Sequence, residues 1–377
     1  MRVTGLFAGV GGIELGLGRS GHEADLLCEN DPGAAAVLRA RFPGVPLAAD
    51  VRDLDALPPG TDLVAAGFPC QDLSQCGGTK GISGEKSGLV SHLFRLLEAT
   101  PSPWVLLENV PFMLRLGGGA AIRHLADRLE SLGYRWAYRV IDARAFGVPQ
   151  RRERVILLAS LADSPAAVLF SGGPGAPGEG DHRGRACGFY WTEGRRGLGW
   201  AVDAVPTMKG GSGVGIPSPP AIWMPDGRIV TPDIRDAERL QGLPVGWTEP
   251  AEAASKPSHR WKLVGNAVNA AVSSWVGARL AWRRDGSAEA SGGLPEKGGW
   301  PKAAAGGPDG RWAVEETTWP AALPAEPLAD FLEFEPKPLS ERATAGFLGR
   351  LLESSLRYPP EFRAALEAHL ERMRAAT

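Results

Sequence analysis

The sequence is poor in cysteine, and its charges nearly cancel. Four cysteines in 377 residues, with no paired spacing, form neither a disulfide framework nor a set of metal ligands. A formal net charge of -2 provides no overall field that attracts a polyanion, so any binding of nucleic acid has to come from local basic clusters. We therefore expect a protein of a reducing compartment that holds no metal.

Long apolar runs are also absent. No stretch approaches the roughly 20 apolar residues that cross a membrane. The first residues, MRVTGLFAGVGG, lack the basic flank, apolar core and cleavage site of a signal peptide. These absences predict a soluble, cytoplasmic protein with no membrane partner. With 44% hydrophobic residues the chain can bury a large core, and its length suits about two or three domains.

Residues 1–162 alternate short β-like runs with stretches that carry apolar residues at helical spacing. This alternation is typical of a parallel sheet covered by helices. We expect an α/β fold with a doubly wound, mostly parallel sheet. The expected strands are 3–7, 63–67, 104–108, 135–141 and 154–159, and the expected helices are 88–99 and 120–132.

The composition changes beyond residue 162. Glycine, proline and single aromatics then dominate, which predicts a smaller, irregular domain, before an apolar helical run returns to the first domain. The tail contains two expected helices, one capped at Ser340 and one starting at Pro359. The expected parts are an irregular domain at 163–258, a returning helix at 259–283, a Gly/Pro/Ala-rich linker at 284–311 and a helical C-terminal extension at 312–377.

A glycine-rich stretch, GLFAGVGGIELG, follows the first expected strand and enters a helix, so a ligand can approach its backbone closely. Glu29 ends the next apolar run, where a carboxylate can accept hydrogen bonds from ribose hydroxyls, and Asp50 lies at a further strand end. Together these features predict an adenosine-type cofactor, either a nicotinamide or S-adenosylmethionine. Taken singly, the stretch can be a tight turn and each acid an ordinary loop carboxylate.

A cysteine and a glutamate each follow an expected strand, Cys70 in GFPCQDLS and Glu108 in PWVLLENV. Because the carboxyl ends of parallel strands line the ligand crevice, a nucleophile and an acid would share one site. QRRER adds Arg152 and Arg154 to the same rim, since alternation along a strand sends both to one side. The alternatives are a small buried cysteine, a helix-capping glutamate and a solvated run of arginines.

These stretches, in this order, resemble the DNA cytosine-5 methyltransferases of bacteria and phages. The motifs are LFAGVGG, the acid of CEND, ADV, GFPCQDLS, ENV, QRRER, RDAERLQGLP and VGNAV, and they extend over about residues 1–283. One departure is Gly5, where the family often has aspartate, and it concerns a helix–loop hydrogen bond, not the chemistry. The tail from residue 284 lies outside the resemblance.

The resemblance implies methyl transfer from S-adenosylmethionine to C5 of a cytosine that is flipped out of duplex DNA. Cys70 matches the thiolate that adds to C6, which nearby arginines favour. Glu108 matches the acid at N3 and the exocyclic amine, and Arg154 the arginine at O2, with Arg152 in support. The matching cofactor positions are Phe7, Gly9, Gly11, Gly12, Glu29, Asp50, Pro69, Asn266 and Val268, of which Asn266 could alternatively cap a helix.

The resemblance also assigns the insert after QRRER to target recognition. Basic residues alternate with aromatics in RGRACGFYWTEGRRG, and the glycine-rich PTMKGGSGVG can approach base edges. About half of these charges are alternatively solvated surface. The expected DNA-contacting residues are Gln71, Ser74, Arg183, Arg185, Arg195, Arg196, Thr207 and Lys209.

Three other functions have to be weighed. A thiol hydrolase needs a histidine partner, and none of the six histidines lies in a catalytic motif. A catalytically silent DNA-binding relic would have a degenerate PCQ or ENV, and both are intact. A transfer RNA substrate is the main alternative, because some family members with the same motifs methylate RNA. We expect double-stranded DNA as the substrate and a monomer on DNA, and the family allows a cognate restriction endonuclease as companion.

Overall fold

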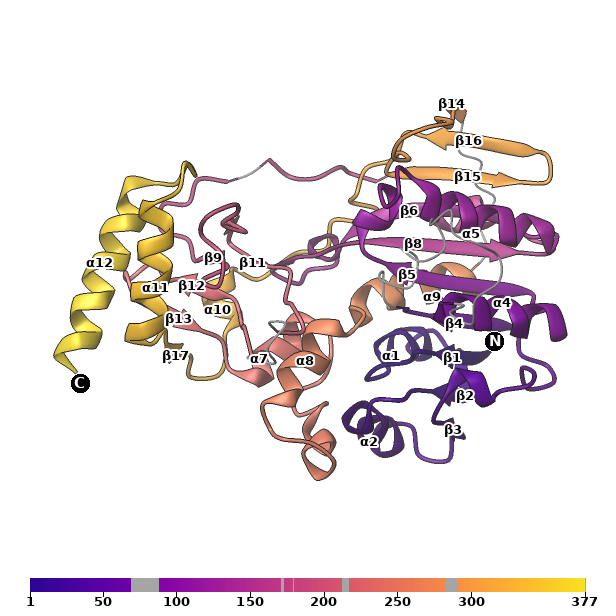
Figure 1. The fold of residues 1–377 in the computed structure, drawn as a ribbon, viewed down its shortest axis with the longest axis horizontal. Helices are drawn as coiled ribbons and strands as arrows, with labels where there is room; N and C mark the ends of the chain where they lie inside the picture. The colour runs from indigo at the N-terminus through magenta and orange to yellow at the C-terminus, as the bar shows by residue number, and fades with distance from the viewer. Residues whose placement is uncertain (69–87, 171–172, 179, 212–216, 283–289, 377) are drawn as a thin grey trace.

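The computed structural model describes residues 1–68, 88–170, 173–178, 180–211, 217–282 and 290–376. Figure 1 shows a large unit around a long sheet, joined to a smaller unit around short strands, with helix α8 (His259–Asn266) between them. Among the described helices, none has both the length and the apolar character that crossing a membrane requires.

Ten strands form the large sheet within the described residues, in the order β14-β16-β15-β6-β8-β5-β4-β1-β2-β3. The half from β3 to β5 is parallel, β8 runs antiparallel between β5 and β6, and the last three strands extend the sheet by antiparallel pairs. The strands are β1 (Arg2–Leu6), β2 (Glu23–Cys28), β3 (Leu47–Ala48), β4 (Leu63–Ala66), β5 (Trp104–Asn109), β6 (Arg135–Asp142), β8 (Glu153–Ser160), β14 (Ala290–Gly293), β15 (Ala303–Gly307) and β16 (Gly310–Val314).

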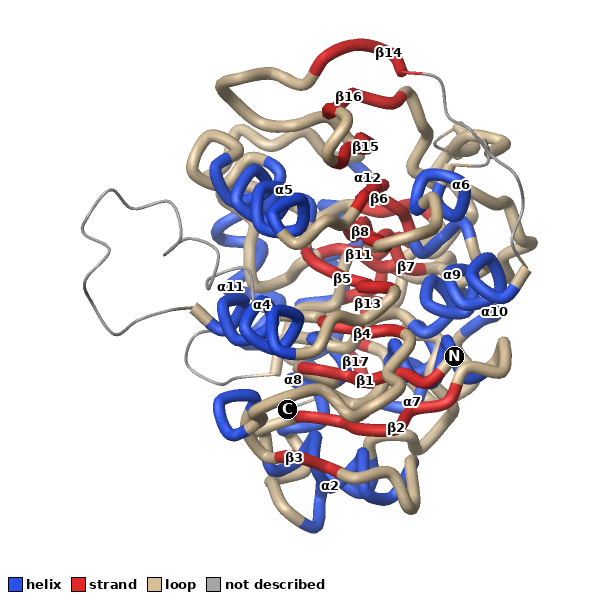
Figure 2. The backbone as a smooth tube through the Cα atoms, turned by 90° about the vertical axis from the view of Figure 1, so that its right-hand side faces the viewer, coloured by secondary structure: helices blue, strands red, loops and turns tan. Residues whose placement is uncertain are grey.

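Helices cover both faces of this sheet, which confirms the doubly wound α/β class (Figure 2). Alternation along β4 sends Val64 and Ala66 to the core under α4 and α5, and Leu63 and Ala65 to the core under α1, α6 and α9. The helices of this unit are α1 (Gly12–Gly18), α2 (Pro32–Arg41), α4 (Leu89–Ala99), α5 (Ala120–Ser131), α6 (Pro165–Leu169) and α9 (Ala270–Ala281), with short 3-10 turns η1 (Val51–Asp53), η2 (Pro111–Leu114) and η3 (Ala143–Ala145).

The smaller unit contains an antiparallel sheet in the order β10-β9-β12-β13-β17. A short parallel pair, β7 (Gln150–Arg151) with β11 (Val205–Pro206), connects it to the QRRER segment. Its strands are β9 (Cys187–Phe189), β10 (Ala201–Val202), β12 (Ala221–Trp223), β13 (Ile229–Thr231) and β17 (Lys337–Pro338), and the elements around them are α7 (Ile234–Leu240), η4 (Glu249–Ala253), α10 (Leu328–Phe331), α11 (Glu341–Leu352) and α12 (Pro360–Ala375).

The prediction of a linker at 284–311 is wrong for the residues that the structure describes, because β14 and β15 lie there and β15 pairs with β6. The small residues of β15 make room for aromatic rings. A Cβ at Gly306 would lie 2.5 Å from Cζ2 of Trp136, which stacks on Trp300 at 5.7 Å between centroids. Alanine and glycine therefore indicate close packing here and not a tether.

The boundaries between the parts of the chain also differ from those predicted. Helix α6 packs on the large sheet, although the smaller domain was expected to begin at 163. The apolar run at 259–283 is two helices, α8 and α9, and Asn269 caps the second by accepting from the amides of Ala271 and Val272. The 312–377 extension is not wholly helical, since it contains the end of β16, which lies between β14 and β15 in the large sheet, and β17, which is an edge strand of the smaller sheet, but both helices start as predicted.

The C-terminal helices belong to the core of the smaller unit. Phe347, Phe362 and Leu366 are fully buried against Phe189 of β9.

Replacement of Phe362 by alanine should destabilise the smaller unit by about 3 to 5 kcal/mol, because it removes a fully buried ring and leaves a cavity. Arg363→Ala, on the exposed side of the same helix turn, is the control. Thermal unfolding followed by near-UV circular dichroism measures the difference. Equal melting temperatures for the two variants would show that the extension is accessory.

Gly5, the position that departs from the family pattern, lies against the side chain of Glu14 in the core. A Cβ at Gly5 would collide with the carboxyl group of Glu14, whose side chain is buried with neither oxygen hydrogen-bonded. Burial raises the pKa of the Glu14 carboxyl to about 7. In the folded protein Glu14 is therefore largely protonated at mildly acidic pH and fills the space beside Gly5.

The stability of the protein should fall as the pH rises from about 4.5 to 7. The folded state holds the Glu14 proton in this range while the unfolded chain releases it, so about 3 kcal/mol is lost. Glu14→Gln, which cannot ionise, should remove this part of the pH dependence. Denaturant unfolding at pH 5 and pH 8 measures it, and parallel pH profiles for variant and wild type would contradict the assignment.

Candidate active site

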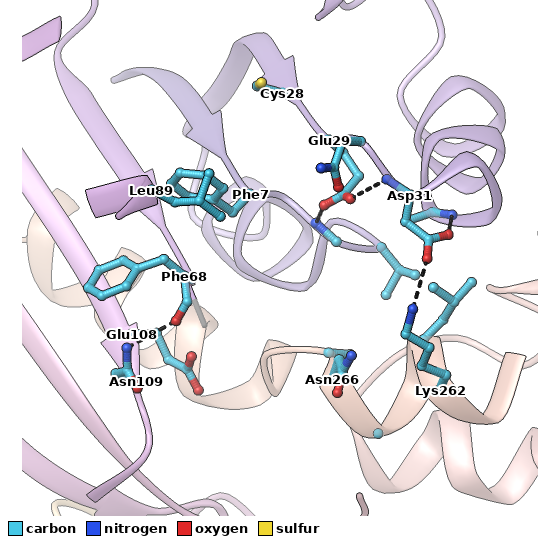
Figure 3. Close-up of a pocket in the computed structure, with 18 of the residues that line it drawn as sticks. Phe7, Cys28, Glu29, Asp31, Phe68, Leu89, Glu108, Asn109, Lys262 and Asn266 are labelled. Atoms are coloured by element: carbon cyan, nitrogen blue, oxygen red, sulfur yellow. Dashed lines mark hydrogen bonds and ion pairs between the residues drawn. The ribbon is translucent and has the colours of Figure 1, made fainter. Parts of the chain in front are cut away.

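A cavity of about 490 Å³ opens at the carboxyl ends of β1, β2, β4 and β5, and α8 closes its opposite side. Figure 3 shows Glu108 and Asn109 on one wall, Glu29 and Asp31 on another, and Asn266 and Lys262 on α8. Phe7 and Leu89 lie together at the apolar end. The cavity thus combines a flat apolar surface with several carboxylates.

The glycine-rich stretch forms the floor of the cavity. Phe7 adopts the left-handed region with φ 55°, which is costly for a residue with a side chain and is typical of functional sites. The two carboxylate oxygens of Glu29 accept from the amides of Gly9 (2.8 Å) and Asp31 (2.7 Å). These bonds fix the position of the Glu29 carboxylate at the cavity wall.

Asp50 also lines the cavity, as predicted, but it is already paired. Its carboxylate accepts from the backbone amide and the guanidinium of Arg52. Hydrogen bonds from Arg52 lower the pKa of Asp50 to about 2, so the carboxylate stays ionised.

The predicted catalytic pair is assembled at the strand side of the cavity. Glu108 is the second-last residue of β5 and Arg154 the second residue of β8, and the pairing of these antiparallel strands brings Nε of Arg154 within 2.9 Å of Oε1 of Glu108. Both side chains are about nine-tenths buried, and both line the cavity. Next to them, the side-chain amide of Asn109 donates to the carbonyl oxygen of Phe68 (3.0 Å). This bond fixes the end of β4.

Arg152 holds segments together and does not reach into the site as a free cation. Its guanidinium is buried and donates to the carbonyl oxygens of Met208 (3.2 Å), Gly265 (3.3 Å) and Ala267 (2.7 Å). Burial lowers its pKa well below the usual value, and the neighbouring Arg154 adds to this effect. We correct its expected role from a supporting catalytic group to a positioning group.

The predicted cofactor positions that the structure describes fall into two sets. Asn266 lines the cavity, together with Phe7, Gly9, Glu29 and Asp50. The other set packs behind the wall, since a Cβ at Gly12 would collide with the carbonyl oxygen of Val268 and one at Gly11 with the ring of Phe42. The members of this set are Gly11, Gly12 and Val268.

Two charged residues of the cavity lining, Asp31 and Lys262, were not predicted from the sequence. Asp31 caps α2 by accepting from the amides of Gly33 and Ala34, and it also accepts from His259 and Lys262 of α8. Burial alone would raise the pKa of Asp31, but the bond from His259 and the other donors hold it below its usual value. The sequence N-D-P at 30–32 indicates that Asp31 caps a helix, but no local signal indicates that it bonds to His259 and Lys262 of α8.

The expected DNA-contacting residues fall into separate groups. Thr207 and Lys209 lie beside the site, because the Thr207 hydroxyl donates to the carbonyl oxygen of Arg151 (2.8 Å) and Gly265 packs against Lys209. Arg195 and Arg196 are exposed on the loop after β9. Arg183 and Arg185 instead border a different cavity of about 210 Å³ beside Trp223 and Glu361.

Pro69, Cys70, Gln71 and Ser74 lie outside the described residues. The two described cysteines are buried, and burial raises the pKa of Cys28 to about 12 and that of Cys187 to about 11. Neither is therefore a reactive thiolate at neutral pH. In the described part of the chain, no group of three or more His, Cys, Asp and Glu side chains is arranged to hold a metal.

Comparison with known proteins identifies the family. The model for C-5 cytosine-specific DNA methylases matches residues 1–173. Type II methyltransferase M2.BsuMI of Bacillus subtilis (strain 168) is 50% identical over 97% of this chain and 97% of its own length. The chain belongs to the C-5 cytosine-specific DNA methylase family. It is a DNA cytosine-5 methyltransferase, and the expectation drawn from the ordered motifs is confirmed.

More distant relatives match a smaller share of the chain. Type II methyltransferase M.BsuFI of Bacillus subtilis is 36% identical over 41% of this chain and 37% of its own length. Among solved structures, the Entamoeba histolytica methyltransferase EhMeth superposes with a TM-score of 0.51 at 14% identity, covering 73% of this chain and 96% of its own, and shows the common fold.

Proposed function

We propose that this DNA methyltransferase transfers a methyl group from S-adenosylmethionine to C5 of a flipped-out cytosine in a specific duplex sequence, through a covalent adduct with Cys70. The observation that carries the proposal is the Glu108–Arg154 pair, buried at the wall of a cavity that is otherwise built for an adenosine ligand. A flipped cytosine presents hydrogen-bonding groups on its Watson–Crick edge, which a carboxyl group and a guanidinium placed side by side can bind.

The cavity suits S-adenosylmethionine on chemical grounds. Phe7 and Leu89 offer apolar surface to the adenine, Glu29 is held at the wall by two amides, and Asn266 faces the opposite end. The carboxylates of Glu29 and Asp50 favour a cationic ligand. When bound, S-adenosylmethionine supplies an electrophilic methyl group.

The residues of the chain activate the base for that methyl group. The Cys70 thiolate forms a bond to C6, and the displaced electron pair moves through the ring toward C5 and N3, where Glu108 donates a hydrogen bond or proton. Arg154 binds O2 and keeps Glu108 oriented. After methylation, the C5 proton leaves to water, its electron pair restores the C5–C6 double bond and the C6–S bond breaks to release the thiolate. A proton that Glu108 gave to N3 returns to Glu108 in the same elimination, so that the enzyme is regenerated.

Support for duplex DNA comes from the length over which the chain matches a type II methyltransferase. We also propose a monomer on DNA and a cognate restriction endonuclease as companion, because type II methyltransferases are the relatives. Transfer RNA remains the alternative substrate that the first experiment excludes or reveals.

Labelled methyl transfer to mixed-sequence duplex DNA should yield 5-methylcytosine, with no label in transfer RNA. Cys70→Ala should abolish the label and still bind DNA. Duplex with 5-fluorocytosine at the target should trap a covalent adduct with the wild type, because fluorine cannot leave C5 as a proton.

Glu108→Gln should slow transfer by about 100-fold or more. Normal turnover by Cys70→Ala would refute the nucleophile, and label in RNA would overturn the substrate.

Lys262 is a further cofactor contact that we propose. Its bond to Asp31 is the longest that this carboxylate accepts (3.3 Å), and Asp31 has shorter bonds from His259 and two amides. Lys262 is half-exposed and lies one turn before Asn266 on α8, so its ammonium can bind the α-carboxylate of the cofactor's amino acid end.

Lys262→Met should weaken binding of S-adenosylhomocysteine by about fivefold and leave binding of 5′-methylthioadenosine, which lacks the amino acid end, unchanged. Lys256→Met, an exposed lysine before the same helix, controls for loss of charge. Isothermal titration measures both ligands. Equal weakening of the two would mean that Lys262 only ties α8 to α2.

A further inference from the structure

The C-terminal helices pack directly under a loop that carries two of the expected DNA-contacting arginines. We define this loop as the arginine loop, residues 190–197, which follows β9. Phe189, the last residue of β9, contacts the rings of Phe347 in α11 (5.0 Å between centroids) and Phe362 in α12 (4.9 Å). Figure 1 shows both helices beside β9 and β12, at the end of the molecule far from the large sheet. The tail and the root of the loop therefore share one core.

One side chain of α11 holds the loop backbone. Nε of Arg350 donates to the carbonyl oxygen of Glu193 (2.7 Å), and Nη2 donates to that of Trp191 (2.8 Å). Two donors in the fixed plane of a guanidinium determine the relative position of two carbonyl groups, which a lysine cannot do. The turn that follows is closed by the amide of Gly194, which donates to the carbonyl oxygen of Gly197 (3.0 Å).

The tight turn leaves little room between the loop and the helix. Gly194 has φ 106°, a conformation that favours glycine, and a Cβ there would lie 3.2 Å from the ring of Phe347. Arg195 forms an exposed ion pair with Glu353 at the end of α11 (2.7 Å). Such a pair contributes little energy, so Arg195 can exchange Glu353 for a phosphate, and the main restraint on the loop is Arg350.

The same loop contacts the rim of the active site. The Tyr190 hydroxyl donates to the carbonyl oxygen of Thr207 (2.6 Å), and Lys209 lies 3.8 Å above the Tyr190 ring and pairs with Glu193. Thr207 in turn bonds to Arg151, next to Arg152 in the cavity wall. A continuous set of contacts thus runs from α11 through the arginine loop to the site of methyl transfer.

We propose that Arg350 positions the arginine loop for reading the duplex around the target cytosine, so that the C-terminal extension is a working part of target recognition. The inference rests on the proposed function, because it takes duplex DNA as the ligand. Arg195 and Arg196 are exposed on the arginine loop, and Lys209, which contacts this loop through Tyr190 and Glu193, lies beside the active site. Cations in these positions suit phosphate and base-edge contacts. Arg350 does not touch DNA in this arrangement and acts only through the loop.

The test compares Arg350→Met with Arg342→Met, which removes an exposed arginine from the first turn of the same helix. Each variant methylates a DNA library of mixed sequence, and bisulfite sequencing reports methylation at the target and at sites that differ from it by one base pair. The KM values for DNA and for S-adenosylmethionine, the affinity for S-adenosylhomocysteine and the melting temperature are measured in parallel.

Arg350→Met should raise the KM for target DNA by about tenfold and increase methylation at one-mismatch sites, relative to the target, several-fold. The KM for S-adenosylmethionine, the affinity for S-adenosylhomocysteine and the melting temperature should match those of Arg342→Met. Arg350→Lys, which retains the charge but only one well-placed donor, should fall between them.

An unchanged target profile and DNA KM for Arg350→Met would overturn the inference, as would a parallel loss of cofactor affinity and melting temperature, which would give Arg350 a structural role alone. A wild type that forms no 5-methylcytosine in any DNA contradicts the proposed function instead. In that case duplex binding decides the inference, and equal binding by Arg350→Met and Arg342→Met overturns it.

Discussion

The buried guanidinium of Arg152 is the contact on which the arrangement of this enzyme depends. It is 2% exposed, and its Nη1 and Nη2 donate to the carbonyl oxygens of Met208, Gly265 and Ala267, which lie in the segment after β11 and at the α8–α9 connection. A buried cation is costly unless its donors are used, so the three segments have to meet around it. Arg154 follows two residues later on the same strand edge, and Asn266 follows Gly265, one of the acceptors. The Glu108–Arg154 pair, the cavity wall at Asn266 and Thr207 with Lys209 therefore meet around one buried side chain.

Much of the large unit could be predicted from sequence because the signals that define it are local. Apolar alternation marks the strands, and polar residues at their carboxyl ends mark the crevice, so the sequence predicts that Glu29, Asp50 and Glu108 lie close together, and all three line the cavity. The contacts that depend on distant segments were not predictable in this way. Arg152 appears in the sequence as one of three arginines in QRRER, and only its burial against residues 208, 265 and 267 separates its role from that of Arg154. Asp31 and Lys262 are 231 residues apart.

The segment 284–311 differs from the predicted linker for a physical reason that applies to composition in general. Alanine and glycine predict a flexible linker when nothing packs against them, and the same residues are required where a large ring lies flat on a strand. In β15 the ring is Trp136, and its stack with Trp300 and Tyr138 fills the volume that side chains of the strand would occupy. Gly5, which stands where the family often has aspartate, has the same explanation, because the carboxyl group of Glu14 occupies the space beside it. Small residues are required where large side chains pack against the backbone, and a single sequence does not show which side chains those are.

The extension also restricts how the two units move relative to each other. Strands β14 to β16 add to the large sheet, and the chain then crosses to the smaller unit, where β17 pairs with β13 and α12 enters the core. The units are thus connected by the segment after β8, by α8 and by the segment after β16, in addition to the Arg152 contacts. A large hinge rotation would have to break the hydrogen bond from Arg152 to Met208 and the pairing of β7 with β11. The separation between the arginine loop and the Glu108–Arg154 pair is consequently set by the fold, and the distance between duplex and catalytic pair has to be covered by the target base as it leaves the helix.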